Sequence, residues 1–356
     1  MDFLSEKARR LTPYVAGLQP QEAGWIKLNT NENPYPPSPQ VTEALNAVDI
    51  AKLRLYPDGE SEVLKSAIAE SVDLKPENIF CANSSDEVLA LAFQAFFSGK
   101  KRIISPDISY GFYPVWAEMY DAEMIFAPVC RDFLINPSDY KNANGVVIAN
   151  PNAPTSLAMG LCEIEEILCA NANSVVIIDE AYIDFADTDS FKSAVSLVNS
   201  YENLLVVRTF SKSHSMAGMR VGYALGRASL IDGLRRVRDA FNSYPLDMLA
   251  QTAATAAIKD TEYLGQTIRR IVKTRDKTIF ALREMGFNVL QSQANFIFFE
   301  SEKAAEIYEF LLKNKILVRY WKKPRICNLL RVSIGTESDM EVFTECVNQF
   351  LREGEC

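Results

Sequence analysis

Histidine is almost absent from this chain of 356 residues, which contains only His214. Histidine-rich zinc sites, iron sites built from two histidines and a carboxylate, and HExxH proteases all need more than one, so the sequence excludes them. A Ser-His-Asp or Cys-His mechanism would have to use this single residue. We therefore expect the chemistry to depend on lysine, tyrosine, carboxylates, arginine or a cofactor.

Long apolar runs and paired cysteines are missing as well. No apolar run approaches the length of about 18 residues that a transmembrane helix needs, and the start MDFLSEKARRL lacks the apolar region of a signal peptide. The seven cysteines are scattered and form no C-x-x-C pair. An odd number of scattered cysteines favours reduced thiols in a cytoplasmic protein.

Basic side chains are outnumbered by acidic ones, 37 to 46, which gives a net charge of −9. Because no block of like charge stands out, we expect neither nucleic acid nor an anionic membrane as a partner. Small anions remain possible ligands, since single arginines and helix N-termini can bind them locally. The hydrophobic content of 48% is typical of a soluble protein, and the length suggests about two domains.

Short apolar runs alternate with helix-like stretches between residues 60 and 226. The runs are rich in β-branched residues and apolar on both faces, which is typical of strands in a buried parallel sheet. We predict an α/β fold, in which a large domain with a mostly parallel seven-stranded sheet is followed by a smaller α+β domain. The predicted strands are residues 78–82, 102–105, 123–129, 145–149, 174–179, 203–207 and 221–225.

The segments outside this region suggest how the chain is divided. Residues 27–39, KLNTNENPYPPSP, are rich in asparagine and proline and predict an extended arm. A long helical pattern near 247–286 would connect the two domains. The smaller domain would hold strands near 295–299, 316–320 and 329–334 and helices near 302–314 and 337–352. We expect an N-terminal arm and part of the small domain in 1–45, the large domain in 46–245 and the small C-terminal domain in 246–356.

Polar residues follow five of the predicted strands at their carboxyl ends, where open α/β sheets bind ligands. Five such loops at one edge are better explained by a shared site than by chance. They comprise residues 83–87, the loop with Tyr110, residues 150–155, residues 179–182 and residues 208–212.

Lys212 and Asp179 are the strongest chemical candidates in these loops. Lysine forms a Schiff base with an aldehyde, although a solvated loop lysine is the commoner case. Asp179 ends an apolar run, so it should be buried and need a donor or cationic partner, such as a pyridinium N–H. Arg220 can fork onto a phosphate. These groups together match the needs of pyridoxal phosphate.

The helix start after residue 83 offers a phosphate site. Ser84 and Glu87 have capping-box spacing, and a simple helix cap would explain them without a ligand. Free N–H groups at such a start would also bind a phosphate. Asp86 and Glu87 would oppose this unless their side chains point away.

The motifs SKSHSMAGMRVGY and DEAYIDF resemble those of fold-type-I pyridoxal-phosphate aminotransferases. LTPY, RLYPDGES and LLRVSIGT, in this order, narrow the resemblance to the histidinol-phosphate aminotransferase family. It runs nearly end to end. It implies a cytoplasmic homodimer with pyridoxal phosphate as cofactor. The implied reaction moves an amino group between L-histidinol phosphate and 2-oxoglutarate in histidine biosynthesis, by a ping-pong mechanism.

The resemblance also implies a role for each matching residue. Lys212 would hold the cofactor's aldehyde and transfer protons, Asp179 would keep the ring nitrogen protonated, and Tyr182 would donate to the ring hydroxyl. Tyr110 would stack on the ring. Further cofactor contacts are expected from Ser85, Asp86, Asn152, Thr209, Ser211, Arg220 and, from the second subunit, Tyr56. Substrate contacts are expected from Tyr14, Arg319 and Arg331.

Three positions depart from the family's pattern. Ala153 stands where an asparagine often contacts the ring hydroxyl, so Asn152 is expected to take over. Ser156 and Ser84 stand where glycines are common. His214 lies two residues after the lysine, and we expect it beside the site rather than in catalysis.

The resemblance leaves other functions open. An aromatic amino acid aminotransferase and a threonine-phosphate decarboxylase are alternatives, because an arginine that binds phosphate also binds carboxylate. A non-catalytic binding or regulatory protein on the same scaffold is the alternative from another class.

Overall fold

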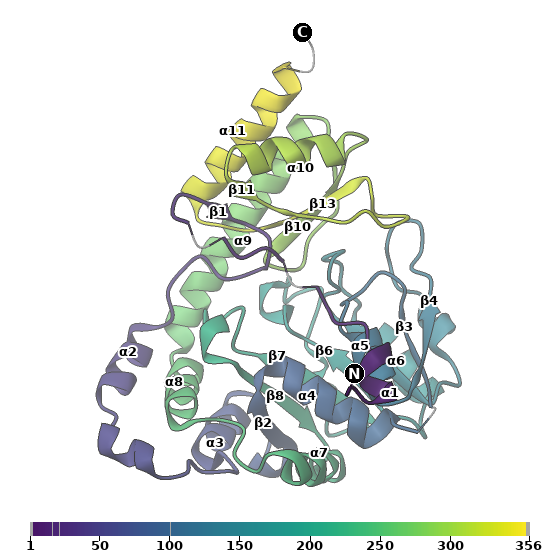
Figure 1. Ribbon diagram of the computed structural model, residues 1–356, viewed down its shortest axis with the longest axis vertical. Coiled ribbons are helices and arrows are strands. Elements are labelled where there is room, and N and C mark those ends of the chain that lie inside the picture. Colours follow the sequence, from purple (N-terminus) through teal and green to yellow (C-terminus); the bar gives the residue numbers. More distant parts are fainter. Residues whose placement is uncertain (1–2, 16, 21, 100, 354–356) are drawn as a thin grey trace.

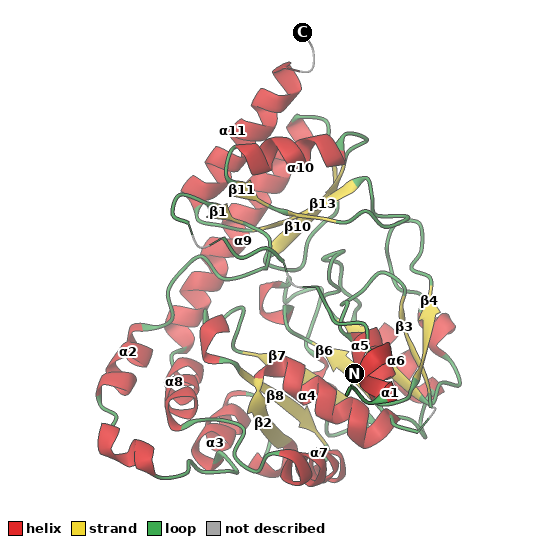
Figure 2. Ribbon diagram, viewed as in Figure 1, coloured by secondary structure: helices red, strands yellow, loops and turns green. Residues whose placement is uncertain are grey.

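The computed structural model describes residues 3–15, 17–20, 22–99 and 101–353. Cys356, one of the seven cysteines, lies outside these ranges. The chain forms a larger part around one sheet and a smaller part above it, with the C-terminal helix at the top (Figure 1). Both parts combine helices and strands (Figure 2).

The sheet of the larger part contains seven strands, and all seven runs predicted from the sequence contribute to it. Its order is β2-β8-β7-β6-β5-β3-β4. Strand β8 is antiparallel to both neighbours, and the other neighbouring pairs are parallel. The predicted α/β fold with a mostly parallel sheet is therefore confirmed. The strands are β2 (Ile79–Asn83), β3 (Arg102–Pro106), β4 (Glu123–Ala127), β5 (Gly145–Ala149), β6 (Val176–Asp179), β7 (Leu204–Thr209) and β8 (Val221–Gly226).

Helices cover both faces of this sheet, which explains why its strands are apolar throughout. Successive residues of a strand point to opposite faces, so Ile177 and Ile178 belong to different clusters of buried side chains. One face packs against α4 (Ser84–Ala92), α5 (Tyr113–Met119) and α7 (Ala228–Phe241). The other packs against α3 (Glu62–Ser71), α6 (Leu161–Ala170) and α8 (Met248–Lys259).

The smaller part is built on an antiparallel sheet in the order β12-β13-β10-β9. Its strands are β9 (Asn288–Val289), β10 (Phe296–Glu300), β12 (Arg319–Tyr320) and β13 (Leu329–Ser333). Its helices are α9 (Thr261–Glu284), α10 (Ala304–Lys313) and α11 (Glu337–Glu353). The long helix expected near 247–286 is two helices, because Asp260 ends α8 and its side chain caps α9 by accepting from the Tyr263 N–H at 3.2 Å.

The N-terminal arm joins the smaller part before it returns to the larger one. After α1 (Glu6–Arg10), strand β1 (Ile26–Lys27) pairs in parallel with β11 (Ile316–Leu317). The single strand expected at 316–320 is thus divided between two sheets. Residues 28–38 then run without helix or strand to α2 (Pro39–Asn46). The boundaries expected at residues 45 and 245 stay predictions.

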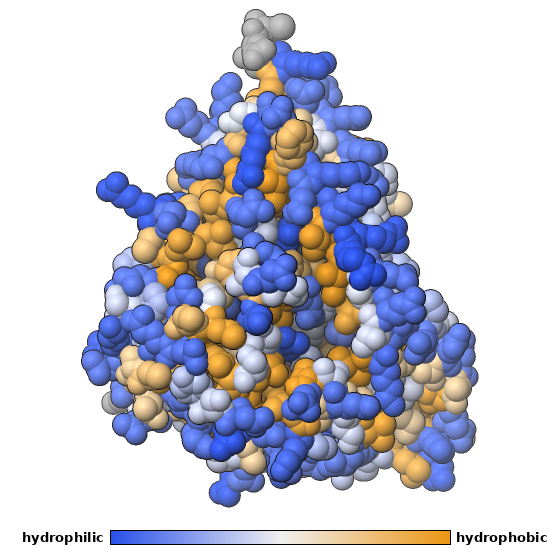
Figure 3. Space-filling model, turned by 180° about the vertical axis from the view of Figure 1, so that it is seen from behind, coloured by the Kyte–Doolittle hydropathy of each residue, from blue (hydrophilic) through white to orange (hydrophobic). Residues whose placement is uncertain are grey.

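Short turns complete the described chain. They occupy Ile50–Arg54, Pro76–Asn78, Pro137–Tyr140, Ile183–Phe185, Ala194–Leu197 and Ala217–Met219, and Phe93–Phe97 extends α4 as a π-turn. Seen from behind, apolar side chains gather in the middle of the surface, between a polar top and a polar base (Figure 3). Within the described ranges, no helix is long and apolar enough to span a membrane.

Candidate active site

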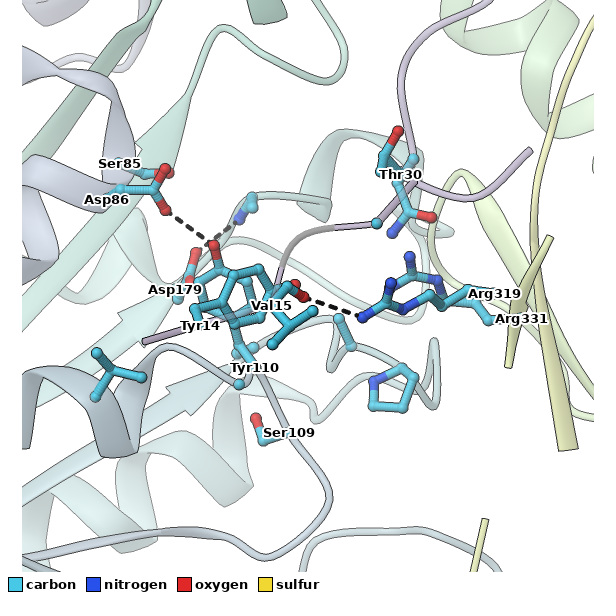
Figure 4. Close-up of a pocket in the computed structure, with 18 of the residues that line it drawn as sticks. Tyr14, Val15, Thr30, Ser85, Asp86, Ser109, Tyr110, Asp179, Arg319 and Arg331 are labelled. Carbon is cyan, nitrogen blue, oxygen red and sulfur yellow. Dashed lines mark hydrogen bonds between the residues drawn. The ribbon is translucent and has the colours of Figure 1, made fainter. Parts of the chain in front are cut away.

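A cavity of about 1230 Å³ lies between the carboxyl edge of the large sheet and the smaller part. Every site residue predicted from the sequence lines it, except Asn152 and Tyr56. Ser85 and Asp86 lie on one side, Arg319 and Arg331 on the other, and the rings of Tyr14 and Tyr110 lie between them (Figure 4). The cavity therefore brings together the polar loops that the sequence places at five strand ends.

Asp179 is the buried carboxylate at the end of β6. It accepts a hydrogen bond from the Tyr113 hydroxyl at 2.9 Å and one from the Ala181 N–H at 3.2 Å. Burial raises the pKa of Asp179 to about 6, although both hydrogen bonds act in the opposite direction. No cationic side chain pairs with it among the described residues, so its charged form is available to a donor in the cavity.

The N-terminal arm contacts Lys212 at its side-chain amine and at its backbone carbonyl group. Its Nζ donates to the Thr30 carbonyl oxygen at 3.1 Å, and its own carbonyl oxygen accepts from Asn33 Nδ2 at 3.1 Å. Nζ also lies 5.6 Å from the centroid of the Tyr182 ring. The lysine amine thus enters the cavity beside Tyr182, within reach of a ligand that carries an aldehyde.

The start of α4 faces Arg220 across the cavity edge. Because β8 is antiparallel, its first residue pairs with Asn83, the residue before α4. Arg220 Nη2 donates to Asp86 Oδ2 at 2.9 Å, and the Tyr110 hydroxyl donates to Asp86 Oδ1, also at 2.9 Å. The Asp86 side chain is therefore paired with the guanidinium of Arg220. A free phosphate site would require this carboxylate to point away.

The expected capping box between Ser84 and Glu87 is not formed. Glu87 accepts from the N–H of Asn83 at 2.6 Å, not from that of Ser84. Ser84 Oγ accepts from the Asp86 N–H at 3.2 Å. Helix α4 begins at Ser84, whose backbone is left-handed with φ of 73°, and the cap residue Asn83 makes no side-chain cap hydrogen bond.

Gly222 allows β8 to pass close to this helix start. A Cβ atom at residue 222 would lie 2.1 Å from the Ser85 backbone nitrogen and 2.3 Å from the Ser84 carbonyl carbon. Real Cβ atoms do not come so close to backbone, so only glycine fits here. On the neighbouring strand, Thr209 Oγ1 donates to Ser211 Oγ at 2.9 Å and accepts from the Ser211 N–H at 3.1 Å. These hydroxyls and the α4 start form a compact polar end of the cavity.

The opposite end of the cavity is cationic. Arg331 Nη2 donates to the Asn29 carbonyl oxygen at 2.6 Å, whereas its buried Nε has no partner within the described chain. Burial lowers the pKa of Arg331 to about 10, and the nearby charge of Arg319 adds to this. The Trp321 ring lies 5.3 Å from the Arg331 guanidinium and 5.4 Å from that of Arg319. An anionic ligand group would supply the missing hydrogen-bond partner of Arg331 Nε and balance the positive charge at this end of the cavity.

Tyr14 closes one side of the cavity between its two ends. Its ring stacks on Phe112 with centroids 4.2 Å apart and lies 6.2 Å from the Tyr110 ring. Arg319 Nη2 donates to the Val15 carbonyl oxygen at 3.3 Å. The segment around Tyr14 is therefore held by both the larger part and the smaller one.

Two expected site residues lie elsewhere. The Asn152 amide donates to the Ile108 carbonyl oxygen at 2.9 Å and to Thr155 Oγ1 at 3.1 Å, and its oxygen accepts from Ser109 Oγ. Asn152 therefore holds its own loop in this structure, and its contact with a cofactor stays a prediction. Tyr56 is 81% exposed and stacks on Tyr244.

His214 lies beside the site and does not line the cavity. Its Nδ1 is 3.1 Å from Ser213 Oγ, and its buried Nε2 has no partner among the described residues. Burial lowers its pKa to about 4. The ring is therefore neutral at physiological pH.

Several site residues escaped the sequence analysis. Tyr113, at the start of α5, does not line the cavity, but its hydroxyl holds Asp179, and no signal in the sequence indicated this contact. Thr30, Asn31 and Lys323 line the cavity from the arm and from the loop after β12. The asparagine-rich arm was the only sequence signal for Thr30 and Asn31, but it indicated an extended chain and not a contact with the cavity.

The donor set fits a ligand that carries an aldehyde, a basic ring nitrogen and a phosphate. Lys212 would reach the aldehyde. Asp179 has no cationic partner, and a protonated ring nitrogen would provide one. The polar end of the cavity near Arg220 would bind the phosphate. In the described chain, no group of three or more metal-ligating side chains is present.

Known proteins resemble this chain in sequence over nearly its whole length. The model of the family "Aminotransferase class I and II" matches residues 23–347. The chain is 46% identical to the histidinol-phosphate aminotransferase of Brachyspira hyodysenteriae, over 98% of this chain and 99% of that protein. It is 48% identical to histidinol-phosphate aminotransferase 2 of Dechloromonas aromatica, over 98% of each chain.

A solved structure shares the fold. The histidinol-phosphate aminotransferase of Sinorhizobium meliloti, determined in complex with pyridoxal-5'-phosphate, superimposes with a TM-score of 0.88. It has 21% sequence identity, and the match covers 99% of this chain and 98% of that one. Together with the family match and the relatives that are nearly half identical over their whole length, this shows that the chain belongs to the class I and II aminotransferases and, within them, to the histidinol-phosphate aminotransferase family.

Proposed function

We propose that this protein is a pyridoxal-phosphate-dependent transaminase that moves an amino group between L-histidinol phosphate and 2-oxoglutarate, in histidine biosynthesis. The observation that carries the proposal is one cavity lined by Lys212 and by the buried Asp179, with Arg331 at its far end. The names of the relatives support the substrate.

The residues of this chain would hold the cofactor at three points. When bound, pyridoxal phosphate supplies an aldehyde that takes up the amino group and a ring that withdraws electrons. Lys212 Nζ would bind that aldehyde and afterwards carry the proton to and from the substrate carbon. Asp179 would hold a proton on the ring nitrogen, and Tyr182 would donate to the ring hydroxyl. Ser85, Thr209, Ser211 and Arg220 would bind the phosphate, and Asp86 would have to release Arg220.

The cationic end would recognise both substrates of a ping-pong reaction. A guanidinium forks equally well onto a phosphate and onto a carboxylate. Arg331, with its unpartnered Nε, would therefore bind the phosphate of L-histidinol phosphate and then a carboxylate of 2-oxoglutarate. Arg319 and the exposed Lys323 line the same end and add positive charge.

A homodimer belongs to the proposal, because Tyr56 lies outside the cavity of its own chain. It stands in a group of exposed apolar side chains, which is typical of a surface covered by another subunit. The group comprises Ile50, Leu53, Leu55, Tyr56 and Tyr244. A second copy would cover them and bring its Tyr56 to the cofactor phosphate. We also propose that the protein is cytoplasmic and has the domain boundaries at residues 45 and 245.

The cofactor is tested by visible absorption. Purified protein mixed with pyridoxal phosphate should develop the absorption band of a lysine Schiff base, and Lys212→Ala should not. Retention of the same band by Lys212→Ala would disprove the assignment of the lysine. Protein that binds no cofactor at all would favour a binding or regulatory role. Sedimentation of the same samples should give a dimer.

The substrate is tested by half-reactions. L-histidinol phosphate, phenylalanine and threonine phosphate are mixed separately with the cofactor-loaded protein, and loss of the Schiff-base band is followed. Conversion should be fastest with L-histidinol phosphate. Faster conversion by phenylalanine would identify an aromatic aminotransferase, and carbon dioxide release from threonine phosphate would identify a decarboxylase.

A further inference from the structure

The arm segment 29–33 contacts the site at several points that the proposed reaction does not use. Arg331 donates to the Asn29 carbonyl oxygen, Lys212 Nζ donates to that of Thr30, and Asn33 donates to the backbone of Lys212. The arm passes between the larger and smaller parts on its way to α2 (Figure 1). It therefore lies where the two parts meet around the cavity.

Asn31 is the buried centre of this segment, with 1% of its surface exposed. Its N–H donates to Ser333 Oγ at 2.8 Å, and its Oδ1 accepts from that same hydroxyl at 2.9 Å. Its carbonyl oxygen accepts from Asn295 Nδ2 at 3.1 Å. Its φ of 57° lies in the left-handed region, where asparagine is favoured over most residues. Three of its polar groups thus anchor it to the smaller part.

The fourth polar group of Asn31 reaches the larger part. Its Nδ2 donates to the Tyr182 hydroxyl oxygen at 3.1 Å. A tyrosine hydroxyl has one hydrogen to donate, and no acceptor for that hydrogen occurs among the described residues. The Tyr182 ring is fixed by an edge contact with Phe296, with centroids 5.0 Å apart. Because Asn31 approaches the oxygen as a donor, the hydroxyl hydrogen is left for the cavity.

We propose that Asn31 is a positioning residue that orients the Tyr182 hydroxyl as a donor into the cavity and ties it to β13, the strand that carries Arg331. This inference rests on the proposed contact between Tyr182 and the ring hydroxyl of the cofactor. Asn31 would act on the cofactor through the Tyr182 hydroxyl, and this is what makes it a positioning residue.

The expected consequence is a change in how the bound cofactor titrates. A donor to the ring oxygen makes that oxygen less basic, so the Schiff-base nitrogen beside it holds its proton less tightly. Weakening the donor should therefore raise the pH at which the absorption of the bound cofactor changes. The ionisable groups around Tyr182, which any variant must leave in place, are Lys212, Arg331, Tyr110, Tyr113 and Asp179.

The test is a pH titration of the cofactor's absorption in the full-length loaded protein without substrate. Asn31→Gly keeps the left-handed backbone and removes the side chain. It should raise the midpoint by about 0.5 to 1 pH unit, the range of one hydrogen bond. Tyr182→Phe should raise it further, and Asn31→Gly should add nothing in the Tyr182→Phe background.

The control loosens the same arm at another point. Tyr263 donates from its hydroxyl to the Pro36 carbonyl oxygen at 2.8 Å, outside the cavity, so Tyr263→Phe should leave the midpoint unchanged. If Asn31→Gly does not fold, Ser333→Ala removes two of the anchors of Asn31 and should raise the midpoint in its place.

Different failures point to different errors. An unchanged midpoint in Asn31→Gly beside a raised one in Tyr182→Phe would overturn the link alone. The link would also be overturned if Asn31→Gly raised the midpoint by the same amount in the Tyr182→Phe background as in the wild type. A folded Asn31→Gly variant that binds no cofactor would overturn it too. An unchanged midpoint in Tyr182→Phe would overturn the role proposed for Tyr182, and the Asn31 link with it.

Discussion

The Tyr113 hydroxyl donates a hydrogen bond to the Asp179 carboxylate at 2.9 Å, and both side chains are buried. Apart from the Ala181 N–H, this is the hydrogen bond that holds the carboxylate in place among the described residues. Burial alone would favour the neutral acid, so the hydroxyl helps to keep Asp179 charged.

We therefore expect Tyr113→Phe to weaken the reaction without removing it. Loss of one hydrogen bond to a charged group costs about 1.5 to 3 kcal/mol, which corresponds to a rate reduced by about tenfold to a hundredfold. The pKa of Asp179 should rise further, so the loss should grow as the pH falls. Turnover measured from pH 6 to pH 9 checks this. Tyr120→Phe, which removes a hydroxyl at the other end of α5 outside the cavity, is the matched control.

Asp179→Asn should stabilise the cofactor-free protein at high pH. The folded-state pKa of about 6 lies above the ordinary 3.8, so the free energy of unfolding falls as the pH rises through this window. A difference of about two pKa units corresponds to about 3 kcal/mol at most. Denaturant unfolding should show the variant more stable at pH 8 and equal to the wild type below about pH 4. With cofactor bound, the order at pH 8 should reverse, because the ring nitrogen loses its partner.

Gly222→Ala should damage the polar end of the cavity by displacing backbone. The added Cβ would meet the Ser85 nitrogen at 2.1 Å, and overpacking of this kind costs about 1 to 3 kcal/mol or more. A lower melting temperature and a weaker affinity for pyridoxal phosphate are expected. Gly265→Ala is the control. Its Cβ would meet only the flexible end of Arg269 within α9, so it should stabilise the protein slightly. Equal behaviour of the two variants would contradict the argument.

His214→Asn should keep activity within about tenfold of the wild type, since a loss above about a hundredfold is typical of a removed acid or base. It should also make the protein less sensitive to acid. The folded-state pKa of about 4 is below the ordinary 6.5, so the buried ring costs stability as the pH falls through this window. Unfolding at pH 7 and at pH 4.5 measures the difference, which should be smaller in the variant.

The sequence was sufficient for the large sheet and for the main chemical groups. The strands are continuous apolar runs because both faces of the sheet are buried, and the ends of such strands must meet at one edge. Lys212 could be singled out there because lysine is the residue type that carries a side-chain amine. Asp179 could be singled out because a carboxylate at the end of an apolar run must be buried.

The contacts between distant segments could not be predicted in this way. Asn31 and Tyr182 are 151 positions apart, and Asn31 and Ser333 are 302 apart, so no local pattern links them. Asn152 was expected at the ligand because its neighbour Ala153 replaces an asparagine, but its amide is satisfied within its own loop. The capping box expected between Ser84 and Glu87 is not formed, and Ser84 adopts a left-handed backbone beside Gly222, a contact between residues 138 positions apart that no local pattern reveals.

Arg331→Lys tests whether the cationic end of the cavity binds a phosphate through two hydrogen bonds from one guanidinium. Lysine keeps the charge but offers a single point of contact, and its shorter reach leaves the Asn29 carbonyl oxygen without its donor. We expect KM for L-histidinol phosphate to rise by about tenfold to a hundredfold, the effect of one lost charge-assisted hydrogen bond. L-Histidinol, which is the same molecule without its phosphate, should be converted at nearly the wild-type rate. Arg319→Lys is the graded comparison: its side chain is held by a longer bond of 3.3 Å to the Val15 carbonyl oxygen, so its effect should be smaller. Equal losses on both substrates would mean that Arg331 supports the cavity wall, because a residue that binds the phosphate should matter only for the substrate that carries one.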